Sequence, residues 1–286
     1  MQVIRPFIVL LRPKHWLKNG LLFVPILYAH NLFELNLLLQ VVWAFMAFCL
    51  LSSAIYVVND LADAERDRRH PTKRQRPIAS GQVGRRQAVC LAILLFLGGF
   101  SLAILGSNTI FVFLFALSYV LLNLAYSFWL KHHAIIDCFC IAAGFVLRIY
   151  AGGAANDGGG ITGWLFLTTT AVSLFMAFGK RRGEMIHMTG DNTTRNVLGS
   201  YNLHFLNGVI FVCAGLSIVF YSLWAMSNVP AMIYTVPPVI FIVCKYLLIV
   251  HGEASCGDPI SVVLGDKTLL AAIGIFSVLS VTLLYL

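Results

Sequence analysis

The sequence predicts an all-α membrane protein, a polytopic bundle of transmembrane helices in one domain over residues 1–286. Three observations predict this class. Hydrophobic residues make up 59% of the chain and charged residues only 11%, against about 25% charged in an ordinary soluble domain. The apolar residues gather in runs of about 20, the length of a spanning helix. The basic residues are confined to alternate segments between these runs, and a soluble enzyme is therefore excluded.

Nine apolar runs are separated by polar breaks, and we expect each run to form a membrane helix. The five tryptophans mostly fall near the ends of these runs, as expected for an aromatic belt at the membrane interfaces. An odd number of spans places the two termini on opposite sides. In chain order, the predicted spans cover residues 16–29, 37–58, 87–106, 109–129, 134–153, 162–180, 204–225, 231–250 and 267–286.

The positions of the basic residues test this topology. Nine spans place five segments on one face, and these contain 18 of the 20 lysines and arginines, while the four opposite loops contain none. By the positive-inside rule that face is cytoplasmic, so we expect a multi-pass protein of the inner (cytoplasmic) membrane with its N-terminus inside. The net charge of +8 is then explained by topology, and no nucleic-acid partner is expected. The five segments are 1–18, 59–86, 130–133, 180–203 and 251–267.

Three carboxylates follow the second apolar run. If that helix continues, Asp60, Asp63 and Asp67 share one face at positions i, i+3 and i+7. Such crowding is unfavourable unless a cation neutralises it, and hard oxygen ligands suit Mg²⁺ bound jointly with a substrate's phosphates. The alternative is a solvated acidic helix end that is neutralised by Arg66 and the arginines after it. The dipole at a helix C-terminus disfavours that alternative, so we predict a metal site.

Cations stand directly behind these carboxylates. The segment 68–78 contains Lys73 and Arg76 among five lysines and arginines. Basic side chains can hold terminal phosphate oxygens while a metal ion bridges a leaving diphosphate. Positive charge for topology alone would explain the sign of these residues but not their placement beside the aspartates. A polyphosphate site is therefore predicted here.

A buried arginine is predicted in the fifth span. Asp137 and Arg148 are eleven residues apart, which is three turns, and hence lie on one helix face with Gly144 between them. An arginine at this depth is costly in lipid, so it should face a cavity or water and pair with an acid or an anionic ligand. Pairing with Asp137 is disfavoured, because the rise between them is roughly 16 Å.

The pattern Asn-Asp-x-x-Asp-x-x-x-Asp at 59–67 resembles the first aspartate motif of the UbiA superfamily of intramembrane polyprenyl transferases. Further blocks are similar to its decaprenyl-phosphate phosphoribosyltransferase branch, and together they cover nearly the whole chain. These blocks are residues 11–19, 70–77, 144–153, 179–184 and 257–266.

The resemblance implies a helical bundle around a cavity that opens laterally to lipid, with a cytoplasmic cap formed by the loops 59–86 and 180–203. It implies transfer of 5-phosphoribosyl from phosphoribosyl diphosphate (PRPP) to a polyprenyl phosphate, with release of diphosphate, for the synthesis of lipid-linked pentose donors. Mg²⁺ would be held by Asn59, Asp60, Asp63 and Asp67, the three aspartates being the catalytic residues. The substrate-binding candidates are Lys18, Arg66, Lys73, Arg76, Tyr126, Lys131, Asp137, Arg148, Lys180, Arg181, Arg182 and Glu184.

One departure from the superfamily pattern favours this branch. Members that prenylate aromatic rings usually carry a second Asp-x-x-x-Asp after the sixth span, but here the segment 180–184 reads Lys-Arg-Arg-Gly-Glu, followed by Asp191 and Arg195. Cations there suit a directly held phosphate. An aromatic prenyltransferase remains the first alternative. A transporter is the second, disfavoured because the ionisable residues gather at one membrane face and no inverted repeat is evident.

The partners expected are PRPP, the polyprenyl phosphate and the bilayer, and a homo-oligomer is left open. A last acidic group, Glu253, Asp258 and Asp266, could complete the pocket, bind a second metal or lie in an ordinary loop.

Overall fold

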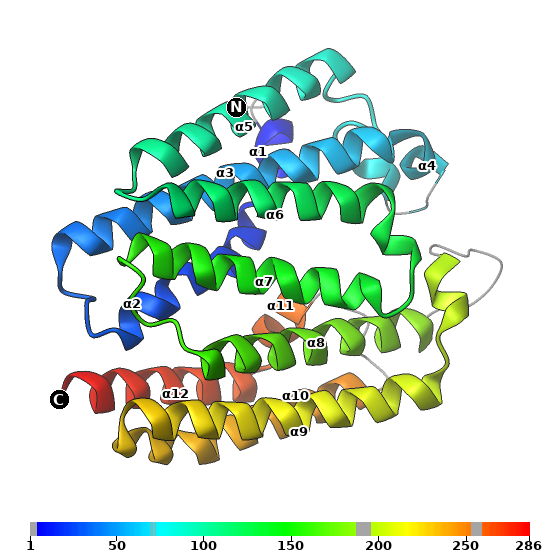
Figure 1. Ribbon diagram of the computed structural model, residues 1–286. Helices are drawn as coiled ribbons and strands as arrows, with labels where there is room; N and C mark the ends of the chain where they lie inside the picture. The colour runs from blue at the N-terminus through cyan, green and yellow to red at the C-terminus, as the bar shows by residue number, and fades with distance from the viewer. Residues whose placement is uncertain (1–4, 70, 72, 187–195, 253–258) are drawn as a thin grey trace. The chain divides into compact units, whose positions relative to one another are not determined.

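The computed structural model describes residues 5–69, 71, 73–186, 196–252 and 259–286. All regular elements in these ranges are helices (Figure 1), which confirms the predicted all-α class. The chain forms two compact units. One contains Met1–Ser127 and Leu147–Gly160, and the other contains Phe128–Val146 and Ile161–Leu286.

Seven helical segments of the described chain are long and apolar enough to cross a membrane. They correspond to seven of the nine predicted spans, so a multi-pass membrane protein is confirmed but the count of nine is not. The seven segments are Leu35–Ala62, Arg85–Leu105, Ile110–Phe128, Ile136–Ala155, Leu203–Ser227, Pro230–His251 and Lys267–Tyr285.

The two remaining predicted spans form helical segments that are not both long enough and apolar enough to be counted as membrane-spanning helices. The first, 16–29, is a 3-10 helix η1 (Pro13–Phe23) followed by a short helix α2 (Val24–Tyr28). Pro25 lies at the junction, where its missing N–H and its ring prevent one continuous α-helix. The sixth corresponds to α8 (Gly163–Ile186), a helix of 24 residues. Its three threonines in a row and its basic end lower its hydropathy.

The first unit is built around α3 (Leu35–Ala62), which packs against α5 (Arg85–Leu105), η1 and the short N-terminal helix α1 (Arg5–Leu11). The side chains of Phe48 and Leu51 on α3 are fully buried in its core. The ring of Phe48 lies tilted against that of Tyr119 in α6 (Ile110–Phe128), with the ring centres 5.2 Å apart. Beyond α3, the chain forms α4 (Ala64–Arg69) and η2 (Lys73–Gln75). The C-terminal end of α3 is thereby placed beside α4 and η2.

Gly152 brings two backbones of this unit together. It lies near the end of α7 (Ile136–Ala155), the helix whose first part belongs to the second unit. A Cβ atom at Gly152 would lie 2.1 Å from the backbone oxygen of Leu22 in η1. Only glycine allows this approach, so η1 packs directly on α7.

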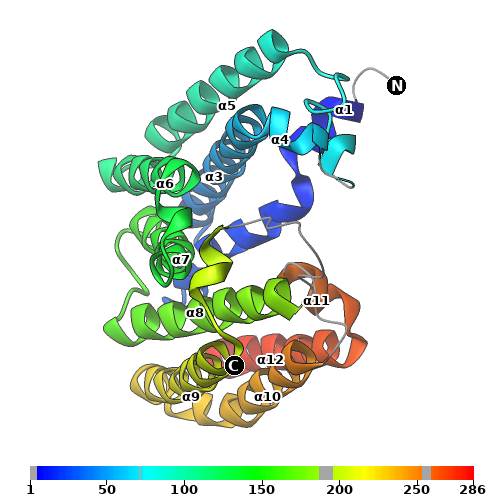
Figure 2. The same cartoon turned by 90° about the vertical axis from the view of Figure 1, so that its right-hand side faces the viewer.

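The second unit is a layered set of long helices. Figure 2 shows α9 (Leu203–Asn228) against α8, and α10 (Val236–His251) beside α9 and α12 (Lys267–Tyr285). Asn202 and Asp266 cap α9 and α12 by accepting hydrogen bonds from the N–H groups of Phe205 and Leu269. The remaining elements of this unit are η3 (Leu130–His132), η4 (Asn196–Ser200), η5 (Pro230–Thr235) and α11 (Pro259–Gly265).

Candidate functional site

The first two carboxylates of the predicted metal motif lie where α3 ends. Asp60 is in the last turn of α3 and is only 3% exposed. The helix does not continue as the spacing argument assumed, because α3 ends at Ala62, Asp63 is its C-cap and α4 begins at Ala64. Asp63 is half-buried, while Asp67 in α4 is as buried as Asp60.

Arg76 joins the two buried carboxylates. Its Nη1 atom lies 2.7 Å from Asp67 Oδ2 and 3.1 Å from Asp60 Oδ1. The oxygens of the two aspartates therefore converge on a single cationic nitrogen. Two buried carboxylates this close need such a cation, since burial of an unpaired charge is strongly unfavourable.

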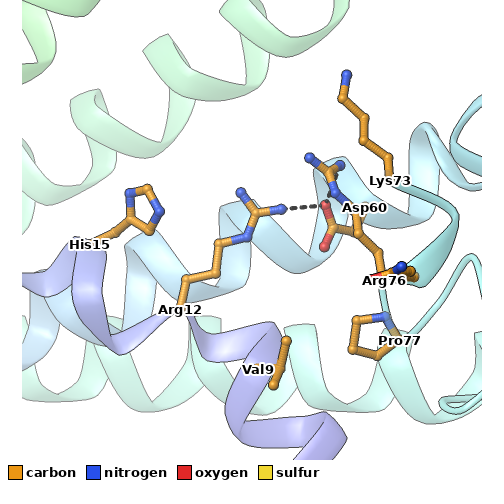
Figure 3. Close-up of a pocket in the computed structure, with 8 residues that line it drawn as sticks. Val9, Arg12, His15, Asp60, Lys73, Arg76 and Pro77 are labelled. Carbon is orange, nitrogen blue, oxygen red and sulfur yellow. Dashed lines mark hydrogen bonds and ion pairs between the residues drawn. The ribbon is translucent and has the colours of Figure 1, made fainter. Parts of the chain in front are cut away.

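Arg12 approaches Asp60 from the opposite side. Its Nη2 atom lies 2.7 Å from Asp60 Oδ1, and its guanidinium carbon lies 4.7 Å from the centre of the Tyr56 ring. The backbone of Arg12 is left-handed, with φ 51° and ψ 58°, a conformation that costs a residue with a Cβ atom about 1–2 kcal/mol. This turn separates α1 from η1 and directs the side chain toward α3 (Figure 3).

Hydrogen bonds fix the backbone on both sides of Arg12. Ser53 on α3 donates to the carbonyl oxygen of Leu11 at 2.8 Å and accepts from the indole N–H of Trp16 at 3.0 Å. The segment Leu11–Trp16 is thus attached to α3 at Ser53, about two turns before Asp60. This attachment holds the strained turn at Arg12 in place.

Arg12, Asp60 and Arg76 help to line a cavity of about 400 Å³. Figure 3 shows Arg12, Lys73 and Arg76 around Asp60, with His15 at one side. Cationic groups therefore outnumber the one carboxylate in this lining, Asp60, and the lining residue Arg76 also binds the buried Asp67. The lining residues are Val9, Arg12, His15, Asp60, Lys73, Gln75, Arg76 and Pro77.

The donor set fits a divalent cation that is shared with a ligand. Asp60 and Asp67 already present oxygens to one cationic atom, Arg76 Nη1. Within the described residues, no three His, Cys, Asp or Glu side chains are grouped so that they could hold a metal by themselves. Mg²⁺ commonly takes one or two carboxylates and completes its shell with water and substrate phosphates, so two aspartates with Asn59 nearby in sequence suffice.

Arg148 lies in a separate polar cluster in the interior of the first unit. Its Nε atom donates to Asn19 Oδ1 at 2.7 Å and its Nη2 atom donates to the Tyr119 hydroxyl at 2.8 Å. Its guanidinium carbon also lies 4.5 Å from the Tyr119 ring centre. Asn19 is fully buried and donates toward Cys49 and Ser52 of α3. Arg148 therefore connects α7, α6 and η1 through neutral partners.

In the second unit, Asp137 is fully buried and binds two side chains. Arg181 Nε donates to Asp137 Oδ2 at 2.6 Å, and the Tyr201 hydroxyl donates to Asp137 Oδ1 at 2.7 Å. Burial and then the hydrogen bond to Asp137 raise the pKa of Tyr201, so the hydroxyl stays protonated and can donate. Arg181 is 1% exposed and also pairs with Glu184. Such a network stabilises the packing of α7 and α8 with the segment between η4 (Asn196–Ser200) and α9.

Arg182 points to another part of the second unit. Its Nε atom donates to Asn207 Oδ1 at 2.7 Å, and Nη1 donates to the backbone oxygen of Val250 at 2.6 Å. Val250 is in the last turn of α10, where a cation also compensates the helix dipole.

The other predicted residues are spread over the two units. Arg66 is exposed, and Lys18, Tyr126, Lys131 and Lys180 are half-buried. Asp266 binds Lys245 at 3.0 Å. The hydrogen bond from the Leu269 N–H, and then Lys245, lower the pKa of its carboxyl group. Outside the described residues lie Asp191, Arg195, Glu253 and Asp258.

Sequence reasoning missed several participants. Arg12 and His15 line the cavity, although only the similarity of residues 11–19 to the family had pointed to this segment. Asn19, Tyr119 and Tyr201 bind the charged groups predicted to be functional. A signal existed for Arg12, since a basic residue before a proline lies at a turn near a membrane face. The tyrosines could not be distinguished from core or interfacial aromatics.

The fold and the site define a multi-pass helical membrane protein in which basic residues surround paired carboxylates at a helix end. Comparison with known proteins then gives the family: the model of the UbiA prenyltransferase family matches residues 21–256. The chain therefore belongs to the UbiA prenyltransferase family.

Two relatives carry the name decaprenyl-phosphate phosphoribosyltransferase. That of Mycolicibacterium smegmatis is 35% identical over 277 residues, which cover 90% of this chain and 86% of the relative. That of Corynebacterium glutamicum is 37% identical over 220 residues, which cover 76% of this chain but only 66% of the relative. Among solved structures, a UbiA homologue from Archaeoglobus fulgidus bound to DMAPP and Mg²⁺ has a TM-score of 0.74 at 17% identity, covering 100% of this chain and 98% of that one. This likeness confirms the fold.

Proposed function

We propose that this protein transfers the 5-phosphoribosyl group from PRPP to a polyprenyl phosphate of the decaprenyl type and releases diphosphate. The product would be a lipid-linked pentose donor. The observation that carries the proposal is the 35% identity, over 90% of this chain, to a decaprenyl-phosphate phosphoribosyltransferase. The cavity at the end of α3 supports it independently.

The electrostatics of the cavity suit a compact polyanion. Arg12, Lys73 and Arg76 present three permanent cations around a space of about 400 Å³. Six of the eight residues that line it have polar or charged side chains, which suits a phosphorylated headgroup. Guanidinium groups hold phosphate oxygens through paired, charge-assisted hydrogen bonds.

The reaction breaks the bond between C1 of the ribose and the diphosphate oxygen, and the electron pair leaves with the diphosphate. A new bond forms between C1 and an oxygen of the lipid phosphate. Because that phosphate is already anionic, its oxygen needs no general base, and the protein's work is to position it. Arg12, Lys73 and Arg76 would hold the donor's phosphates, and their charge favours departure of the leaving group.

Asp60 and Asp67 would hold Mg²⁺ together with the donor, assisted by Asn59 and Asp63. When bound there, Mg²⁺ supplies further neutralisation of the departing diphosphate. Arg76 bridges the two aspartates, and so keeps their carboxylates side by side before any ligand binds. This arrangement avoids reorganisation of the carboxylates during the reaction.

The acceptor would approach from the bilayer. Apolar side chains such as Leu94 and Leu97 on α5 are 66% and 62% exposed, as expected for surfaces in contact with lipid. The polyprenyl chain would remain in the membrane while its phosphate meets the donor at the interface. We place this interface and the N-terminus on the cytoplasmic side of the inner membrane, since 18 of 20 basic residues lie on that predicted face.

The remaining predicted residues differ in whether their side chains are already engaged by protein partners. Lys18, Lys131 and Lys180 are half-buried cations and stay candidates for the lipid phosphate, with Tyr126 and Arg66. Arg148, Asp137, Arg181, Arg182 and Glu184 are engaged with protein partners. We infer that these five residues have a primarily structural role.

A matched pair of variants tests the site. Asp67→Asn should reduce transfer of label from PRPP into lipid by about 10²–10³-fold, because it removes one of the two converging carboxylates. Glu65→Gln, in the same short helix but exposed, should transfer label at the wild-type rate. Circular dichroism and size-exclusion chromatography in detergent check that both variants fold. Equal activity in the two variants would contradict the proposed site.

A further inference from the structure

We propose that Arg12 is a donor-binding residue that rests on Asp60 and exchanges this partner for phosphate when the cation and the donor bind together. This inference deepens the proposed function and rests on it, since it takes the ligand's anionic part to be the donor's diphosphate. Its consequence is that Arg12 couples two ligands: it opposes binding of the divalent cation alone and favours binding of the anion.

The geometry of Asp60 carries the first step. Its Oδ1 atom accepts from both Arg12 Nη2 at 2.7 Å and Arg76 Nη1 at 3.1 Å. Asp67 accepts from Arg76. Two guanidinium groups therefore occupy the oxygen that a divalent cation would need, and at least one of them must leave it.

The contacts of the two arginines decide which one leaves. Arg76 is held by both aspartates, whereas Arg12 has, among the residues that the structure describes, one carboxylate partner in addition to the ring of Tyr56. The Arg12 side chain is 24% exposed and faces the cavity. Release of Arg12 from Asp60 therefore breaks fewer ion pairs than release of Arg76 would.

The anchoring of Arg12 explains why release does not disorder the site. Ser53 holds the backbone at Leu11 and the indole of Trp16, so the backbone on both sides is fixed to α3. Only the side chain needs to rotate. The contact between the Arg12 guanidinium and the Tyr56 ring does not depend on Asp60. This contact can keep the guanidinium partly shielded from water while the side chain rotates into the cavity.

The released guanidinium finds its new partner in the same cavity. Arg12, Lys73 and Arg76 line one space, so a diphosphate that contacts Lys73 comes within the reach of Arg12. Exchange of one anionic partner for another preserves the charge pairing of the arginine. A cation alone would leave Arg12 without a carboxylate, whereas a diphosphate alone still gains Arg12 as a partner but shares it with Asp60.

Binding measurements with two simple probes test the exchange. Wild-type protein, Arg12→Gln and the control Lys14→Gln would be titrated in detergent with Mn²⁺ alone, followed by electron paramagnetic resonance, and with inorganic diphosphate alone, followed by calorimetry. Lys14 is exposed and is not among the cavity residues. A third titration with both probes, corrected for their association in solution, gives the coupling between them.

Arg12→Gln should change the two affinities in opposite directions. Mn²⁺ alone should bind several-fold more tightly, diphosphate should bind about tenfold more weakly, and the coupling should fall by a comparable factor. Lys14→Gln should leave all three values unchanged. If Arg12 had only a structural role, Arg12→Gln would weaken the binding of both Mn²⁺ and diphosphate. Unchanged or weaker Mn²⁺ binding, or unchanged diphosphate binding, would overturn the proposal.

Two further controls keep the test decisive. Arg12→Lys retains the charge without the planar fork, so it should give intermediate values, and it provides the test if Arg12→Gln does not fold. The probes contain neither ribose nor lipid. Failure of PRPP to donate its ribosyl group would therefore contradict the proposed function and leave the exchange standing, whereas parallel changes in the two probe affinities would contradict only the exchange.

Discussion

The buried pair of Asp137 and Arg181 gives a quantitative test of how the second unit is held together. The two side chains are 0% and 1% exposed, and Nε and Oδ2 are 2.6 Å apart. Removal of one partner of a fully buried pair costs about 3–5 kcal/mol, because the other charge stays buried without compensation. We therefore expect both Asp137→Asn and Arg181→Met to lower the free energy of unfolding.

The remaining contacts predict which variant is worse. In Asp137→Asn, Arg181 keeps Glu184 as a partner, so the loss should lie near 3 kcal/mol. In Arg181→Met, Asp137 keeps only the neutral Tyr201 hydroxyl as a side-chain partner among the residues that the structure describes, so the loss should approach 5 kcal/mol. The double variant removes both charges. It should be more stable than additivity predicts by about 2 kcal/mol or more.

Reversible unfolding in mixed detergent micelles, followed by circular dichroism, measures these values. Arg85→Met, which removes an exposed arginine, is the control and should change stability by less than about 0.5 kcal/mol. Additive losses, or a loss below about 1 kcal/mol for Arg181→Met, would refute the reasoning. An increased KM for PRPP at unchanged stability would instead return Arg181 to the substrate site.

Three further predictions concern other parts of the chain. Asp60→Asn should lower transferase turnover by about 10²–10³-fold, which a turnover assay measures. Its free energy of unfolding should stay within about 1 kcal/mol of the wild-type value, because both arginine partners are partly exposed. Unfolding in mixed micelles measures this second value. Gly152→Ala should cost about 1–3 kcal/mol, because its Cβ atom would meet the backbone of Leu22, and Gly163→Ala, with open space around it, should not. The lowered pKa of Asp266 means that its stabilising contribution is present above the ordinary aspartate range and is lost as the pH falls through the lowered value. Unfolding of Asp266→Ala should accordingly depend less on pH on the acid side than that of the wild type.

Hydrophobic length and charge placement predicted the fold class because both follow from the bilayer itself. Runs of about 20 apolar residues must form helices in lipid, and seven such helices are present in the described chain. Two predicted spans are not among these seven: α8, whose threonines and basic end lower its hydropathy, and the segment 16–29. Its composition is apolar, but Pro25 prevents one continuous helix, and the average hydropathy of a run does not register a single proline.

The site was predictable only in part, for a geometric reason. Asp60 and Asp67 are only seven positions apart in the sequence, and both bind Arg76 although the continuous helix assumed from their spacing is interrupted. Asp63 departs from the predicted convergence because α3 ends one residue before it. Arg12 lies 48 residues from Asp60, and no periodicity connects positions so far apart. Tertiary partners of this kind require the structure.

Asp137 shows that protein partners can satisfy a buried charge that also suggests a ligand site. A carboxylate and an arginine inside an apolar run indicated a ligand site, because unpaired charge is not tolerated there. The structure supplies protein partners for both: Arg181 and Tyr201 bind Asp137, while Asn19 and Tyr119 bind Arg148. The sequence shows that a buried charge needs a partner but not which partner it has.

A comparison of two possible donors, each supplied in a separate assay, tests the central claim most directly. Purified protein in detergent with Mg²⁺ would receive either PRPP labelled in its ribose together with polyprenyl phosphate, or labelled prenyl diphosphate together with an aromatic acid. Label recovered in the lipid extract would be counted with and without EDTA. The account predicts EDTA-sensitive transfer from PRPP only, with one diphosphate released for each labelled lipid. Product from the prenyl diphosphate pair alone would contradict it and identify an aromatic prenyltransferase.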